Sequence, residues 1–292
     1  MTAPPMAYWA GSDQDGAAMN TATTVSPFAL ALLAITALAT GAHAQAPAAS
    51  PDYAELPDWS GVWQMTSNTV FDQATVEPPG GSSNAPGTRE YPPYNDEWEA
   101  KYAANRELVA QGRFPDPITT CGTPTGYPRL LNLPGAYEFV LRPEGLWILT
   151  EDGPNIMRIH TDGREHPGPN DRWPTFSGES VGYWEDDTLV FETISLRGEG
   201  DTILDRTGLV LSEQARIVTR MRSVAPDRIE ARFTIEDPEA LVGPWNVVKE
   251  YRRLEPGTRM FEFACAENNR NPVDASGRTL LLDAEGNIID SP

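Results

Sequence analysis

From residue 136 onward the chain is a succession of short strand-like segments separated by turn residues, and this pattern constrains its fold more than any other feature. The segment "RIEARFTIED" (228–237) shows the pattern most clearly. Four apolar residues alternate along it with four polar ones: Ile229, Ala231, Phe233 and Ile235 against Glu230, Arg232, Thr234 and Glu236. Such alternation is typical of an antiparallel strand with one buried face.

Further segments of the same kind follow one another along the chain: 136–142, 146–151, 155–161, 180–185, 188–196, 208–223, 245–254 and 259–266. Together they give nine or ten strands in sequential order. We therefore expect an all-β, mainly antiparallel fold, either a single β-barrel or a barrel-like sandwich.

The part of the chain before these strands contributes less regular structure. A first strand is expected within 57–71, and one short N-terminal helix over about 96–111, where Asn95 or Asp96 would serve as the cap. Residues 77–95 and 114–136 are rich in Pro and Gly and are expected to be loops. No second domain boundary is evident, so we expect a single β-rich domain over 57–292.

The N-terminus has the pattern of a secretory signal peptide. An apolar run over 28–42 is followed by Ala42-His43-Ala44, which predicts a signal peptide over 1–44 and a flexible lead-in over 45–56. The run is shorter than the roughly 20 residues that a membrane-spanning helix needs. No Lys or Arg precedes Ala44, and initiation at Met19 would explain this departure from the usual pattern. The sequence thus predicts a periplasmic or secreted protein without a stable membrane span.

Charge and cysteine content further narrow the class of protein. The formal net charge is -20, with 22 Lys and Arg against 42 Asp and Glu. Such a chain repels phosphate backbones and anionic lipids, so nucleic-acid and membrane-surface binding are not expected. Export would place Cys121 and Cys265 in an oxidising compartment, and we predict a disulfide between them; two buried free thiols are the alternative.

The stretch 178–182, "GESVG", matches the G-x-S-x-G pattern of hydrolases in which Ser180 would be the nucleophile. That motif requires a strand before the serine and a helix after it, whereas strand, turn and strand follow here. His160 and His166 both precede Ser180, which is the wrong order for the triad of that fold. We therefore interpret Gly178 and Gly182 as sites of close backbone approach.

Two hairpins are predicted, and each carries a candidate catalytic residue. A turn at Asp186-Asp187 would pair Val181 with Glu192 and set this carboxylate among apolar neighbours, which would raise its pKa and suit it as a general acid. The alternative is a solvated outer face.

A second turn, at Asp162-Gly163, would pair Ile159 with His166 and place Arg164 beside it. A neighbouring cation keeps imidazole neutral, as general base catalysis requires, and Arg164 would hold a developing anion. The alternative is a hairpin-edge histidine without a role. This turn would put His160 on the opposite face, so no metal ion and no cofactor are expected.

Several blocks occur in the order of a known group: "SGVW" (60–63), "CGTPTGYPR" (121–129), "TDGREHP" (161–167), "GESVGYWEDDTLVFET" (178–193), "EDPEALVGPW" (236–245) and "CAEN" (265–268). The chain resembles a large group of uncharacterised bacterial proteins with signal peptides and D-G-R-x-H-P and G-x-S-x-G-x-W-E-x-D-T-L-V motifs. The resemblance covers most of 57–270 and implies that Asp162, Arg164, His166 and 184–187 are family features. Asp186 departs from the group, which usually has Gly there.

A second resemblance, to lipocalins, is confined to Gly61-Val62-Trp63, which is similar to their G-x-W motif at the start of the first strand. The T-D-Y element of lipocalins is not matched, because Gly163 follows Thr161-Asp162. The resemblance therefore implies an analogy of architecture only.

Two functions are consistent with these sequence features. The first is a β-barrel that binds a small, largely apolar molecule in its lumen, with contacts from these residues: Trp63, Arg129, Tyr137, Trp147, Tyr183 and Trp184. The second is an acid–base enzyme of the isomerase, cyclase or lyase type, acting on a hydrophobic substrate. It would use His166 as base, Arg164 as anion clamp and Glu192 as acid. The sequence leaves the oligomeric state open.

Overall fold

The computed structural model describes residues 51–67, 92–116, 118, 125–152, 156–198, 201, 203–205, 208–261, 263, 274–276, 280–282 and 286–289. All of them belong to one structural unit, Gln45–Pro292. The expected signal peptide and both cysteines, Cys121 and Cys265, lie outside the described residues, so the disulfide stays a prediction.

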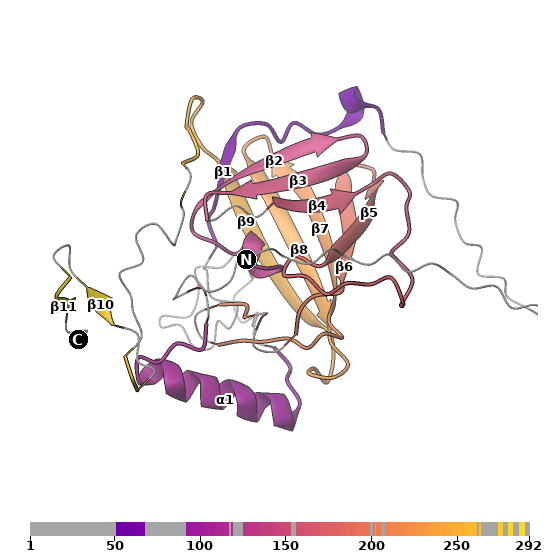
Figure 1. The fold of residues 1–292 in the computed structure, drawn as a ribbon. Coiled ribbons are helices and arrows are strands. Elements are labelled where there is room, and N and C mark those ends of the chain that lie inside the picture. Colours follow the sequence, from indigo (N-terminus) through magenta and orange to yellow (C-terminus); the bar gives the residue numbers. More distant parts are fainter. Residues whose placement is uncertain are drawn as a thin grey trace, which may run out of the picture. The chain divides into compact units, whose positions relative to one another are not determined.

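Nine strands form a closed barrel (Figure 1). They are β1 (Val62–Met65), β2 (Ala136–Arg142), β3 (Gly145–Thr150), β4 (Ile156–His160), β5 (Glu179–Glu185), β6 (Thr188–Ile194), β7 (Arg216–Ala225), β8 (Arg228–Glu236) and β9 (Trp245–Arg253). The barrel closes where Trp63 of β1 lies opposite Arg253 of β9. Neighbouring strands run antiparallel except β4 and β5, which are parallel. The all-β barrel is thus confirmed, and closure excludes the sandwich.

The strand boundaries differ from the sequence prediction at two places. The strand expected over 208–223 begins only at Arg216, because residues 209–211 are buried outside the barrel ladder. The strand expected over 259–266 is not seen in the described part of that segment, where Phe263 forms a single bridge to Asp152. A closed barrel leaves no free edge for a tenth strand. Two short strands, β10 (Leu281–Leu282) and β11 (Ile288–Ile289), were not predicted and pair with each other.

Inward-facing side chains fill the barrel. The alternation predicted for β8 is confirmed, since its four apolar residues face inward and are at most 1% exposed. Aromatic rings dominate the interior, among them Trp63, Tyr137, Phe139, Phe191, Phe233 and Tyr251. The rings of Tyr137 and Phe139 stack, and Tyr251 meets both edge-on. The lumen is therefore a packed core over the described residues.

The segment before β2, residues 125–135, packs into the barrel and is called the plug. It contains the short helix η4 (Arg129–Leu131). The hydroxyl of Tyr127 shares a hydrogen bond with inward-facing Thr219, and the hydroxyl of Tyr251 donates to the carbonyl of Leu131 at 2.5 Å. These polar contacts hold the plug inside the barrel because a buried hydroxyl needs a partner there.

The helix α1 (Asp96–Ala110) follows β1 in the chain and lies at one end of the barrel (Figure 1). Asn95 caps it as predicted, accepting a 3.1 Å hydrogen bond from the backbone nitrogen of Trp98. Trp98 and Tyr102 are each 1% exposed and form the buried side of the helix. The Asn105 amide donates to the carbonyl of Gly208 at 2.9 Å, which ties the helix to the segment before β7. Among the described residues, α1 included, no helix combines the length and hydropathy needed to cross a membrane.

Candidate functional site

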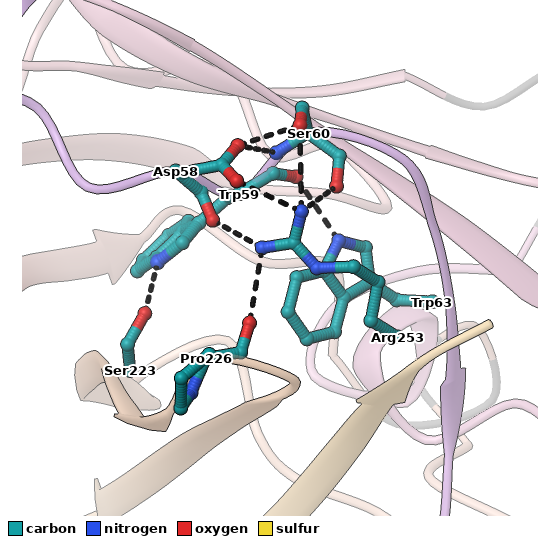
Figure 2. A network of polar contacts seen from close by, with 7 residues as sticks. All are labelled: Asp58, Trp59, Ser60, Trp63, Ser223, Pro226 and Arg253. Atoms are coloured by element: carbon teal, nitrogen blue, oxygen red, sulfur yellow. Dashed lines mark hydrogen bonds and ion pairs between the residues drawn. The ribbon is translucent and has the colours of Figure 1, made fainter. Parts of the chain in front are cut away.

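The end of the barrel opposite α1 is covered by residues 51–61, called the strap, which contain the short helix η1 (Tyr53–Glu55) (Figure 1). One arginine of β9 holds the strap in place (Figure 2). Arg253 Nη1 donates to Asp58 Oδ2 at 3.0 Å and to the Ser60 carbonyl at 2.8 Å, and Nη2 donates to the Asp58 carbonyl at 2.5 Å. Nη2 also donates to the Pro226 carbonyl at 3.2 Å, so the guanidinium joins the strap to the β7–β8 turn.

Local contacts shape the strap itself. Asp58 Oδ1 accepts hydrogen bonds from the Ser60 nitrogen at 3.0 Å and its hydroxyl at 2.5 Å. These bonds, assisted by the charge of Arg253, hold the pKa of Asp58 below its usual value. Trp59 is 1% exposed, and its indole nitrogen donates to the Ser223 hydroxyl at 2.9 Å. Gly61 then adopts a φ of 87°, a left-handed conformation that favours glycine and turns the strap into β1.

A cleft of about 460 Å³ separates the strap from β2. It is lined by residues 53 and 56–61 of the strap and by residues 138–141 of β2. The cleft exists because β1 pairs with β2 only as far as Val62 opposite Glu138, after which the strap leaves the sheet. Its volume falls in the range of small-molecule sites, about 300–1,000 Å³.

Aromatic rings form the cleft floor. Trp59 and Phe139 are almost fully buried, with ring centres 6.1 Å apart. The ring centre of Trp184 lies 6.0 Å from that of Trp59. Trp184 is partly buried and packs against the hydrophobic core. Tyr53, by contrast, is 70% exposed at the cleft. A ligand would thus meet aliphatic and aromatic surface, which suits an apolar molecule.

A second candidate site lies on the outer face of β6 and β7, beneath the connection 161–178 that joins β4 to β5. His166 of this connection places its Nε2 3.5 Å from Glu192 Oε1. Arg216 forms an ion pair with the other oxygen of Glu192, and its Nη1 lies 2.8 Å from Glu236. Glu192 therefore lies between a guanidinium and an imidazole.

Burial determines the protonation state of His166. The side chain of His166 is 14% exposed, and both ring nitrogens are buried without a hydrogen-bond partner among the described residues. Desolvation lowers the pKa of His166, although the nearby carboxylates of Glu192 and Glu179 oppose the shift. The imidazole is thus kept neutral by burial. A neutral imidazole 3.5 Å from a carboxylate has the components of a general base.

The first hairpin prediction is confirmed and explains how Glu192 is placed. Val181 pairs with Glu192 and Glu185 with Thr188, as the turn at Asp186-Asp187 requires. Asp186 has a φ of 52°, the left-handed conformation that a two-residue hairpin needs. Glu192 lies on the outer face, where Arg216 and His166 contact it.

The second hairpin prediction, at Asp162-Gly163, is wrong. Strand β4 ends at His160 and runs parallel to β5, so residues 161–178 form a crossover and not a return strand. Three prolines in it, Pro167, Pro169 and Pro174, cannot donate to a strand ladder. Ile159 is opposite Ser180 instead of His166.

The anion clamp predicted at Arg164 is not beside His166. Its guanidinium is engaged by Asp162, with Nη2 2.6 Å from Oδ2, and this bond lowers the pKa of Asp162. Arg216 is the cation that reaches the Glu192 carboxylate. Sequence reasoning missed Arg216 because its position depends on the β6–β7 register, which no turn between those strands fixes.

The predicted ligand contacts separate into three environments. Trp63 and Tyr137 face the lumen and are fully buried. Trp147 and Tyr183 lie on the outer face, 39% and 49% exposed, so their expected place in the lumen is corrected. Both alternate along their strands with inward-facing residues, and the register leaves them outside. Trp184 does not line the cleft, but its ring packs against Trp59, which does.

Arg129, in the plug, forms contacts inside the protein. Its Nη2 lies 2.9 Å from Asp116 Oδ2, and Nη1 donates to the Ile203 carbonyl at 3.4 Å. Arg129 is 7% exposed and Asp116 1%. A buried guanidinium needs such a partner, so Arg129 is committed to this ion pair and not presented to a ligand.

Ser180 lies within β5 and is not at a strand-to-helix turn. It is 3% exposed and shares a 2.8 Å hydrogen bond with the Thr193 hydroxyl inside the barrel. Gly178 and Gly182 are sites of close approach as predicted, since a Cβ at Gly182 would lie 2.5 Å from the Val190 carbonyl oxygen. The G-x-S-x-G match thus serves packing.

No family model matches the chain, and no curated protein matches it significantly in sequence. The function must therefore be argued from the cleft and from the His166–Glu192 pair. Within the described ranges, no three His, Cys, Asp or Glu side chains come together as a metal site.

Proposed function

We propose that this protein is an exported β-barrel that binds a small, largely apolar molecule in the cleft between the strap and β2. The observation that carries the proposal is the cleft itself. It has a volume of about 460 Å³ and is lined by Leu56, Pro57, Phe139, Val140 and Leu141 together with aromatic rings. Exposed apolar surface of this kind is released from water when a ligand covers it.

The position of the cleft moves the binding site from the lumen to the barrel end. A ligand in the lumen would have to displace the plug and break the hydrogen bonds of Tyr127 and Tyr251. The cleft needs no such opening, because it faces solvent in the structure as it stands. Pre-formed sites bind without that reorganisation cost.

Export is part of the proposal. The apolar run over 28–42 and the A-x-A pattern that follows support a periplasmic or secreted location. The resemblance to signal-peptide-bearing bacterial proteins and the G-x-W start of β1 agree with a small extracytoplasmic binding barrel. N-terminal sequencing of the protein recovered from the periplasm tests this part directly. A mature chain that starts at Gln45 is expected.

The binding test is a ligand-retention experiment. The mature protein is purified from its native periplasm, denatured, and the released small molecules are identified by mass spectrometry. A stoichiometric apolar compound is expected. In the Val140→Gln variant the compound should be lost, because an amide without a hydrogen-bond partner would lie against the apolar ligand in the cleft.

Ile156→Gln is the matched control. Ile156 is 42% exposed and Val140 37%, and both lie on the same barrel, but Ile156 does not line the cleft. The control should retain the compound. Equal loss from both variants, or equal retention by both, would place the ligand elsewhere.

A second candidate function is favoured by one observation, the contact between His166 and Glu192. A neutral imidazole with a carboxylate 3.5 Å away could abstract a proton from a hydrophobic substrate, as an isomerase, cyclase or lyase requires. The charge of Glu192 would stabilise the imidazolium that forms, which replaces its predicted role as proton donor.

The same retention experiment separates the two functions. If His166→Gln retains a different compound from the wild type, related to it as substrate is to product, the protein is an enzyme. If both retain one compound, catalysis by His166 is excluded and the binding function stands.

A further inference from the structure

Two charged residues of the described chain line the cleft, and both are acidic: Asp58 on the strap and Glu138 on β2. Their situations differ. Asp58 is neutralised by Arg253 and accepts two hydrogen bonds from Ser60. The side chain of Glu138 has no hydrogen bond or ion pair within the part of the chain that the structure describes. Among the described residues, the carboxylate of Glu138 therefore has no compensating charge.

The neighbours of Glu138 make this carboxylate sensitive to a ligand. Its Cα partners on the two adjacent strands are Val62 and Leu149, both apolar. Val140, two residues along the same face, is 37% exposed. An apolar ligand that covers this surface would remove water from the carboxylate. Desolvation of an unpaired charge is costly, so a neutral ligand is penalised and an anionic one more so.

A cationic group removes that penalty, since it pairs with Glu138 while the apolar body covers the aliphatic surface. Tyr53, 70% exposed at the cleft, offers a ring face to the same group, and ammonium ions bind aromatic faces. The net charge of -20 also attracts cations to the molecule as a whole. Charge, ring and apolar surface point to one kind of ligand.

We infer that the cleft binds apolar molecules that carry an ammonium group, with the ammonium at Glu138 and the apolar body between the strap and β2. This inference rests on the proposed binding function and specifies its ligand class.

Three probes with the same decyl chain test the inference: decyltrimethylammonium, decanol and decyl sulfate. Each is titrated into the mature full chain below its micelle concentration, and binding is followed by calorimetry. The cation is expected to bind about tenfold more tightly than the alcohol, and the sulfate more weakly than either. In Glu138→Gln the affinity for the cation should fall to that for the alcohol.

Glu97→Gln is the control. Glu97 is exposed on α1, at the other end of the barrel, and the substitution changes the net charge equally (Figure 1). It should leave the preference for the cation intact. If the preference survives in Glu138→Gln, it comes from overall charge and the inference is wrong.

The remaining outcomes distinguish failure of the inferred ligand class from failure of the proposed binding function. Equal binding of all three probes would overturn the inference and leave the apolar binding function standing. No binding of any probe would overturn both.

Discussion

The guanidinium of Arg253 lies 4.6 Å from the centre of the Trp63 ring, so the last strand of the barrel covers the aromatic side chain of the first. The same guanidinium donates to Asp58 and Ser60 of the strap. One side chain therefore contacts both the first strand of the barrel and the strap that walls the cleft, and Figure 2 shows it at the centre of these contacts.

Arg253→Lys should destabilise the protein by about 2–4 kcal/mol. Lysine keeps the charge but cannot reach the strap carbonyls and the Pro226 carbonyl together, as the planar fork of arginine does. The free energy of unfolding is measured by urea denaturation. Binding of the cleft ligand should weaken as well, because the strap loses its anchor.

Arg252→Lys is the matched control, since Arg252 is the next residue on β9 and is exposed. Its expected effect lies within about 0.5 kcal/mol of zero. Equal destabilisation by the two variants would contradict a special role for Arg253.

Gly182→Ala tests the packing role of the G-x-S-x-G segment. The added Cβ would lie 2.5 Å from the Val190 carbonyl oxygen and 2.7 Å from Phe191 Cβ, so β5 and β6 must separate. We expect a loss of about 1–3 kcal/mol in the free energy of unfolding, measured by urea denaturation.

Gly243→Ala provides the comparison, because a Cβ there meets nothing within 4 Å. It should change stability by less than about 0.5 kcal/mol. If Gly182→Ala leaves the free energy of unfolding unchanged, the space between β5 and β6 at Gly182 is wider than in this structure, and the packing role is wrong.

Tyr127→Phe tests the plug. The substitution removes the hydroxyl that meets Thr219 inside the barrel while it preserves the ring. The expected loss is about 0.5–1.5 kcal/mol of unfolding free energy, with faster hydrogen exchange of the amides in 125–135. Tyr53→Phe, at an exposed tyrosine of the strap, should leave both quantities unchanged. Unaltered exchange in Tyr127→Phe would mean that the Tyr127 hydroxyl does not help to hold the plug.

The burial of His166 predicts a pH dependence of stability. Because its folded pKa is lowered below the unfolded value of about 6.5, the unfolded state binds the proton more readily. Stability should be complete above pH 6.5 and should fall as the pH drops below it, until the folded pKa is passed. The melting temperature is measured from pH 7.5 to 5.5 in the wild type and in His166→Gln.

The variant should lose less stability than the wild type over that range. Glu192 and Glu179 oppose the shift, while Arg172 and Arg216 reinforce it, so the sign depends on desolvation. An equally steep fall in His166→Gln would assign the dependence to other groups.

Local chemistry determined several elements that the sequence predicted. Asn95 caps α1 because its side chain reaches the backbone three residues ahead. The Asp186-Asp187 turn sets the register of β5 and β6, since two residues in a turn leave one way to pair the strands. The inward row of β8 follows from alternation alone. Each depends on residues close in sequence.

Only the tertiary structure decided the site. His166 reaches Glu192 because residues 161–178 cross over to a parallel strand, which the Asp162-Gly163 pair did not indicate. Arg216 reaches Glu192 through a β6–β7 register set across a long connection. The cleft lies where the strap leaves β2 beyond Val62, and Arg253, from the last strand, holds the strap by its bond to Asp58. These contacts join residues far apart in the chain, and their geometry is fixed by closure of the barrel, which no local pattern encodes.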